Sequence, residues 1–168
     1  YDSTNNQMLY SYNKAPKSIA AGKFLQADTG WSKPVPIFGA KNGIGEYCKV
    51  ALAKDGSAHV VAYDNLNADV VYAYVPSFDA PGNAVTCVVD SYGLVGTELD
   101  IDVALSDAGT PLPYISYYAG SNALPKTARW SEKTVLSATT LTTGAENEVF
   151  TGAWDISLIP TSSRISVD

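Results

Sequence analysis

Short runs in which apolar and polar residues alternate recur along the chain, and this spacing predicts β-strands. The alternation is clearest in His59–Tyr63 and Val70–Tyr74, where one face is apolar and the other is mixed. Lys54–Ser57 and Asp107–Gly109 lie between such runs, and each carries a glycine suited to the left-handed position of a hairpin turn. Ser18–Leu25 is the one helix candidate. The pattern therefore predicts an all-β chain.

Two long segments of the chain are similar to each other. Val50–Tyr74 and Val103–Trp130 both read as an apolar strand ending in Ala-Leu, an Asp/Gly turn, a strand ending in Tyr, a second turn and an aromatic-bearing strand. Residues 1–12 match only the last part of this pattern, and Trp154–Leu158 matches Ile101–Leu105. Four-stranded antiparallel units in tandem are the blades of β-propellers. We therefore expect one all-β domain, residues 1–168, built of propeller-like repeats.

Three copies of the unit account for nearly the whole chain. They are expected at approximately 31–75, 84–130 and 132–168, with the third completed by residues 1–12. The strands expected in the two unsplit copies are Lys33–Phe38, Glu46–Ala53, Ala58–Tyr63, Asp69–Val75, Val85–Asp90, Glu98–Ser106, Leu112–Tyr118 and Leu124–Trp130. Those expected in the split copy are Thr134–Ser137, Val149–Ser157, Arg164–Asp168 and Gln7–Tyr12.

The repeat resembles the blades of bacterial extracellular β-propellers and, loosely, the sialidase-like repeats whose hairpins carry an Asp-box turn. Lys54-Asp-Gly-Ser57 and Ser106-Asp-Ala-Gly-Thr110 stand where that turn would be, without the aromatic residue that closes an Asp box. The resemblance implies a propeller-like fold and an extracellular setting. It implies no single activity.

The split copy leaves an N-terminal strand that needs a partner. Unpaired sheet edges favour pairing with other strands, and three blades are fewer than the four to eight of most propellers. We expect association with another polypeptide, either a second copy or a companion fragment. A solitary three-bladed ring and a piece of a longer propeller are the alternatives. The residues of the expected assembly strand are Met8, Leu9, Tyr10 and Tyr12.

The charge of the chain argues against nucleic acid as a partner. Its net charge is −6 at pH 7, and its 11 Lys and Arg residues are scattered, whereas phosphate binding needs them clustered. No apolar run approaches the roughly 20 residues of a transmembrane helix. Low charge with many Tyr, Ser, Thr and Asn residues is common in secreted or cell-surface bacterial proteins. Because Tyr1 opens the chain, we expect an extracellular location after removal of an upstream segment, with a trimmed chain as the alternative.

Cysteine and acidic residues provide no expected metal or cofactor site. Cys48 and Cys87 lie in separate strand-like runs, so they form either one disulfide or two buried free thiols. Two cysteines and a single histidine cannot make an ordinary zinc site. A Ca²⁺ site would have to use Asp64, Asp69 or Asp90, but no EF-hand-like spacing supports one.

Catalytic residues are not expected either. His59 is the only histidine, and it lacks an accompanying nucleophile elbow, so we interpret it as a strand residue bonded to a turn carbonyl. Asp100 and Asp102 share one strand face and could serve a glycosidase. However, sialidase chemistry needs an arginine cluster, and only Arg129 and Arg164 are present. Solvated acids on a strand face are the simpler interpretation.

Aromatic residues recur at equivalent repeat positions. They either pack between blades or form stacking platforms for sugars, with neighbouring Asp and Asn side chains bonding hydroxyls. The candidate binding residues are Tyr1, Asp2, Tyr63, Asp64, Asn65, Tyr118, Asn122 and Trp130. We expect a non-enzymatic secreted or cell-surface module that acts in assembly or in protein or glycan binding. The alternatives are a structural subunit of an extracellular filament, sheath or surface layer, and a glycan-active hydrolase.

Overall fold

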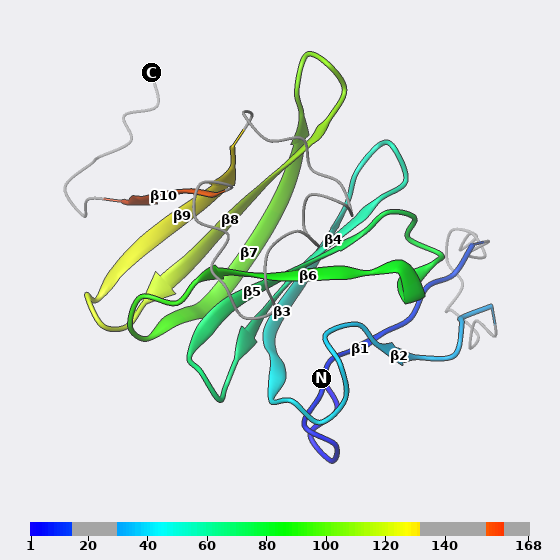
Figure 1. The fold of residues 1–168 in the computed structure, drawn as a ribbon, viewed down its shortest axis with the longest axis horizontal. Coiled ribbons are helices and arrows are strands. Elements are labelled where there is room, and N and C mark those ends of the chain that lie inside the picture. Colours follow the sequence, from blue (N-terminus) through cyan, green and yellow to red (C-terminus); the bar gives the residue numbers. More distant parts are fainter. Residues whose placement is uncertain (15–29, 132–153, 160–168) are drawn as a thin grey trace, which may run out of the picture.

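The protein is described by a computed structural model over residues 1–14, 30–131 and 154–159, and these residues form strands (Figure 1). The strands are β1 (Leu9–Tyr10), β2 (Val35–Pro36), β3 (Ile44–Leu52), β4 (Ala58–Asp64), β5 (Asp69–Val75), β6 (Val85–Asp90), β7 (Val95–Leu105), β8 (Pro111–Ala119), β9 (Leu124–Trp130) and β10 (Trp154–Leu158). One short 3₁₀ turn, η1 (Pro81–Asn83), precedes β6. The described segments contain no helix long and apolar enough to cross a bilayer. The all-β prediction is confirmed.

The strands make three antiparallel sheets. One sheet has the order β3-β4-β5-β6, the second has the order β10-β9-β8-β7, and β1 pairs with β2 in a small third sheet. Glycine turns close the β3–β4 and β7–β8 hairpins, where Ala53 N–H donates to Ser57 O and Ser106 N–H to Thr110 O. Among the described residues the three sheets do not close into a ring.

The β3–β6 sheet lies in the middle and is covered on both faces (Figure 1). The side chains of β4 and β5 are therefore nearly all buried, as in a strand packed on both sides. On one face the core joins the β1–β2 sheet to the middle sheet through Met8, Tyr10, Ile37, Ala58, Val60, Ala62, Val71, Ala73 and Val75. On the other face it joins the middle sheet to β7–β10 through residues that include Val61, Val70, Tyr72, Val89, Ile101, Ile115, Tyr117, Trp130 and Trp154.

The three sheets repeat the same local geometry. Asn6, Ala68 and Ala123 occupy the same position of successive hairpin turns, and all three have left-handed φ angles, of 52°, 62° and 53°. Non-glycine residues seldom adopt such angles, yet here they recur at one position of three turns. The links into the following sheets are similar, because Gly43 N–H donates to Asn6 O and Val95 N–H donates to Ala68 O, both at 3.0 Å. Among the described residues, β1 and β2 thus lie on the middle sheet as β5 and β6 lie on the last one.

The grouping of strands into sheets differs from the expected copies. Val85–Asp90 pairs with β5 and closes the middle sheet, whereas the sequence pattern placed it first in the next copy. Trp154–Leu158 is the fourth strand of the β7–β10 sheet, in register with β9. Of the expected strand Lys33–Phe38, only Val35–Pro36 is paired, and its partner is β1. The N-terminal strand Gln7–Tyr12 therefore lies on the middle sheet and does not complete a C-terminal copy. The segments Ser18–Leu25, Thr134–Ser137, Arg164–Asp168 and 149–153 lie outside the described residues.

Candidate functional site

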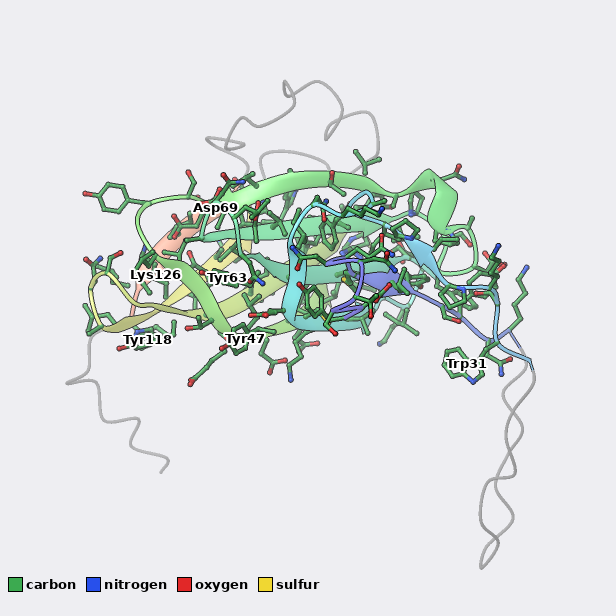
Figure 2. The ribbon with its side chains drawn as sticks, turned by 90° about the horizontal axis from the view of Figure 1, so that it is seen from below. Trp31, Tyr47, Tyr63, Asp69, Tyr118 and Lys126 are labelled. Atoms are coloured by element: carbon green, nitrogen blue, oxygen red, sulfur yellow. The ribbon has the colours of Figure 1, made fainter. Side chains whose placement is uncertain are left out.

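The recurring tyrosines occupy the junctions between sheets. A Cβ atom on Gly45 would lie 2.7 Å from the Tyr1 ring, and one on Gly96 would lie 2.9 Å from the Tyr63 ring. Each ring therefore packs directly on the backbone that starts the following sheet. This contact corresponds to packing between sheets, the alternative to a sugar-stacking role. Tyr118 holds the same position in the last sheet and is 37% exposed (Figure 2). Within the described residues, no further sheet covers it.

The acidic residues beside these tyrosines hold turns together. Asp2 Oδ1 accepts hydrogen bonds from Thr4 N–H and Asn5 N–H, and Asp64 Oδ1 accepts the equivalent pair from Leu66 and Asn67. The side-chain amides at the same two positions donate to the second carboxylate oxygen, at 2.8 Å in both turns. These bonds lower the pKa of Asp2. Both carboxylates are thus engaged locally, as expected for Asx turns.

The remaining candidate binding residues do not form one surface. Trp130 is fully buried, with its ring 5.2 Å from that of Trp154, so it cannot offer a stacking platform. Asn65 lies at the link between the first two sheets, where its N–H donates to Gly43 O. Asn122 is exposed in the β8–β9 turn.

The expected assembly strand is anchored to the middle sheet by its side chains. Met8 and Tyr10 are each 7% exposed, and the Tyr10 hydroxyl donates to Phe78 O at 2.8 Å. Tyr12 packs edge-on against the Phe78 ring, whereas Leu9 is 36% exposed. The strand pairs with β2 on one side only; on its other side, no strand of the described residues pairs with it.

The two cysteines do not form a disulfide. Cys48 is on β3 and Cys87 is on β6, the two outer strands of the middle sheet, and both thiols are free. Three strand spacings of about 4.8 Å each separate these strands, whereas a disulfide needs Cα atoms within about 7 Å. Burial raises the pKa of the Cys87 thiol to about 12. The interpretation as two free thiols is the correct one.

His59 belongs to a buried chain of hydrogen bonds. The Ser57 hydroxyl lies 2.6 Å from the Asp55 carboxylate and 2.9 Å from His59 Nε2, and the Tyr72 hydroxyl lies 2.6 Å from His59 Nδ1. Because the carboxylate takes the single Ser57 proton, His59 must donate from Nε2, and Tyr72 must donate to Nδ1. Burial lowers the pKa of His59 to about 4, so the ring is neutral at pH 7. The partners are side chains and not the expected turn carbonyl.

This chain of bonds cannot activate Ser57. A general base must accept the serine proton, and here His59 donates to the serine instead. His59 is also fully buried and leaves no room for a substrate. Its effect is to tie the turn before β4 to the centre of β5.

A second buried polar group joins the middle sheet to the last one. Lys126 Nζ and the Tyr117 hydroxyl both donate to Asp90 Oδ2, at 2.8 Å and 2.7 Å. Burial opposes ionisation of Asp90, but these bonds outweigh it and lower the pKa of the carboxyl. Burial and repulsion from Asp64 and Asp90 raise the pKa of Asp69 to about 6. Because Lys126 already neutralises Asp90, this cluster suits an ion pair better than Ca²⁺, and the described residues contain no group of acidic, His or Cys side chains able to hold a metal.

The outer face of the β7–β10 sheet is polar. Ser116, Thr127 and Arg129 occupy the positions that Val61, Tyr72 and Tyr74 occupy in the middle sheet. Asp100 and Asp102 lie exposed on this same face, and Arg129 forms an exposed ion pair with Asp155. The three carboxylates are therefore solvated acids on a strand face, in agreement with the simpler interpretation.

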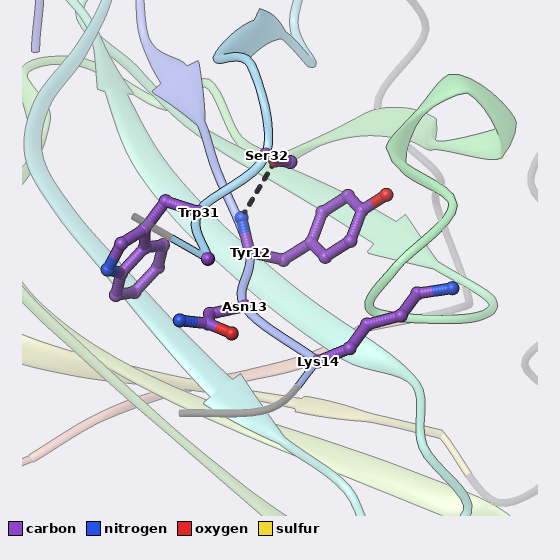
Figure 3. Close-up of a pocket in the computed structure, with 6 residues that line it drawn as sticks. Tyr12, Asn13, Lys14, Trp31 and Ser32 are labelled. Atoms are coloured by element: carbon purple, nitrogen blue, oxygen red, sulfur yellow. Dashed lines mark hydrogen bonds between the residues drawn. The ribbon is translucent and has the colours of Figure 1, made fainter. Parts of the chain in front are cut away.

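An open hollow of about 310 Å³ lies at the other end of the molecule (Figure 3). The rings of Tyr12 and Trp31 stand on its two sides, with Asn13 between them and Lys14 nearby. Tyr12 N–H donates to Ser32 Oγ at 3.1 Å, which holds the two chain segments together. Trp31 is 58% exposed, and it lies at the opposite end from Tyr118 (Figure 2). The sequence pattern gives no sign of this hollow, because the hollow depends on residues 12–14 and 30–32 meeting in space.

Comparisons of the chain with protein-family models, with curated proteins and with solved structures find no match.

Proposed function

We propose that the protein is a non-enzymatic β-repeat module that acts in assembly at the cell surface or outside the cell. In this proposal its sheets are propeller-like blades, stacked one after another by the repeated tyrosine and glycine junction. Assembly joins the β1–β2 sheet to a further copy of the chain.

The difference between the two ends of the stack supports this proposal most directly. In repeat proteins, terminal units end on a polar face, whereas internal units end on an apolar one. The β7–β10 sheet ends on Ser116, Thr127 and Arg129, so its outer face suits water. In the part of the chain that the structure describes, no strand pairs with the outer edge of β1, and such an edge suits strand addition.

The chemistry of the polar clusters favours a non-enzymatic role. His59 is locked as a donor to Ser57, and Asp90 is neutralised by Lys126. Because the outer face of the β7–β10 sheet suits water, the further copy joins the β1–β2 sheet through another of its surfaces. Such a contact between two different surfaces closes into a ring or extends as a filament, depending on the angle between copies. The filament form corresponds to a subunit of a sheath or surface layer.

Light scattering across a wide range of concentration tests the proposal. We expect a mass above the 17.8 kDa of one chain, which Leu9→Lys reduces towards 17.8 kDa because a charge on an edge strand opposes pairing. Leu158→Lys is the matched control, since Leu158 is an exposed leucine on the edge strand of the last sheet. A mass of one chain at every concentration would contradict assembly with further copies.

Glycan binding at the Tyr12–Trp31 hollow is a second candidate function. Two aromatic rings with an amide and an ammonium group nearby suit the apolar face and the hydroxyls of a sugar ring. Trp31 fluorescence in a titration with soluble oligosaccharides should change, and Trp31→Ala should abolish binding. Tyr92→Ala, which removes an aromatic ring that is 76% exposed elsewhere, should leave binding unchanged. If no oligosaccharide alters the fluorescence, this candidate is excluded.

A further inference from the structure

A lysine and an aspartate lie against each other in the core between the middle and last sheets. Lys126 Nζ is 2.8 Å from Asp90 Oδ2, and the two side chains are 7% and 4% exposed. The Tyr117 hydroxyl donates to the same oxygen at 2.7 Å. Asp90 Oδ1 accepts a hydrogen bond from Tyr92 N–H at 2.9 Å, so both carboxylate oxygens are held in place. An amine-bearing side chain thus meets a fixed carboxyl group away from solvent.

The other junction between sheets is built without charged groups at the corresponding positions. Lys126 is the third residue after the left-handed residue of its hairpin turn, and its partner across the hairpin is Tyr117. In the middle sheet Val71 stands at the same distance from its turn and pairs with Ala62. Both belong to the apolar core towards the β1–β2 sheet. Since buried ion pairs are often no more stabilising than apolar residues, packing alone does not account for the charged pair.

We propose that Lys126 and Asp90 react with each other to form an amide bond between the side chains, an isopeptide cross-link that joins the last sheet to the middle sheet. The new bond forms between Lys126 Nζ and Asp90 Cγ, and the bond between Cγ and Oδ2 breaks. Two protons pass from Nζ to Oδ2, one before the attack and one after it, so that Oδ2 departs as water. The product is a neutral amide with one N–H, and no other reactant is consumed.

The surroundings of the pair favour this reaction in three ways. A carboxyl C–O bond is about 1.2 Å long, so Nζ lies within about 4 Å of Cγ, and the fold holds the two groups together instead of leaving them to collide. The amide is neutral, so the reaction removes two charges that are costly to bury. The Tyr92 N–H and the Tyr117 hydroxyl donate to the two carboxyl oxygens and stabilise the negative charge that develops there during the attack.

The mass of the full chain tests the proposal. Electrospray mass spectrometry of the purified chain, denatured and reduced so that only covalent cross-links remain, should give the sequence mass less one water molecule. Glu98 lies between Asp90 and Lys126 in the sequence, so a protease that cuts after glutamate separates the two residues. We expect its digest to contain one branched product in which a peptide with Asp90 is joined to a peptide with Lys126. Loss of stability in Lys126→Met does not distinguish an amide from an ion pair, whereas mass does.

Two variants show whether the lost water comes from this pair. Lys126→Arg keeps the positive charge beside Asp90, but its guanidinium stays protonated and cannot attack the carboxyl group, so this chain should have its full sequence mass. Lys49→Arg is the matched control, because Lys49 is exposed on β3, and this chain should still lack one water. Tyr117→Phe removes a donor to the departing oxygen and should leave part of the chain at its full mass. Circular dichroism checks that each variant folds.

Each outcome supports or overturns the cross-link. An unchanged chain that keeps its full sequence mass after prolonged incubation in the folded state overturns it and leaves an ion pair only. A water loss that persists in folded Lys126→Arg also overturns it, because another pair of groups must then have reacted. The branched product from the unchanged chain establishes the bond even if a variant does not fold. The result is independent of the proposed assembly, since a cross-link within one chain does not require a further copy.

Discussion

Replacing Gly96 with alanine should damage the junction between the middle and last sheets. Gly96 has a φ of 112°, and an added Cβ would meet Tyr63 at 2.9 Å, Val70 at 3.1 Å and the Asp69 carbonyl oxygen at 3.2 Å. The left-handed backbone alone costs a non-glycine residue about 1–2 kcal/mol. Overpacking against two side chains and a backbone atom adds about 1–3 kcal/mol. We expect Gly96→Ala to lower the free energy of unfolding by about 2–5 kcal/mol.

Gly109→Ala is the matched control, because it separates backbone strain from contact. Gly109 has a φ of 78° and no atom within 4 Å of its would-be Cβ. It should lose only the backbone share, about 1–2 kcal/mol. Urea unfolding followed by tryptophan fluorescence measures both variants, and Trp130 and Trp154 in the core report the transition. If Gly96→Ala costs no more than Gly109→Ala, the close contact between the sheets is not what the structure indicates.

Three further predictions concern the buried polar groups and the thiols. Lys126→Met should lower the free energy of unfolding by about 3–5 kcal/mol, because it leaves the Asp90 carboxylate buried without its lysine partner. A decrease below about 1 kcal/mol, measured by urea unfolding, would contradict a buried Lys126–Asp90 ion pair. Asp69→Asn should stabilise the fold by about 1–2 kcal/mol above pH 6 and have little effect below pH 3.8. The reason is that folding raises the pKa of Asp69 from 3.8 to about 6, so the charged carboxylate destabilises the folded state only at a pH above its unfolded pKa. Thermal unfolding at several pH values checks this, and an equal gain at all pH values would argue against it. Because Cys48 and Cys87 are free, a reducing agent should leave the melting temperature unchanged, whereas a lower melting temperature would indicate a disulfide.

The strands could be predicted from the sequence because their side chains alternate between two environments. The expected ranges for β5, β6 and β9 coincide with the structure, whereas β4 is longer than expected by one residue at its end and β8 by one residue at each end. The turns after Ala53 and Ser106 were also visible, since each has a glycine between two strand-like runs.

The grouping of these strands was not predictable from the same pattern. Residues 76–84, rich in Pro and Gly, look like a boundary between units, but they connect β5 to β6 within one sheet. Residues 91–94 look like a hairpin, but they cross to the next sheet, where Val95 N–H bonds to Ala68 O. That bond joins residues far apart in sequence, and local alternation carries no information about it.

The candidate site was only partly accessible from the sequence. The tyrosine repeat was recognised, but its packing partners are glycines on the following sheet, and the choice between packing and sugar binding depends on that contact. The partners of His59 had a local signal, because Ser57 and His59 stand two apart and share one strand face.

Residue-resolved hydrogen exchange of the full chain tests the central claim, that the β1–β2 sheet docks on the middle sheet by a junction like the one between the middle and last sheets. The amide of Gly43, bonded to Asn6 O, and the amide of Val95, bonded to Ala68 O, report on the two junctions. We predict that both are protected well beyond the exposed amides around them. Protection at Val95 with free exchange at Gly43 would show that the N-terminal sheet is not docked and would contradict the account.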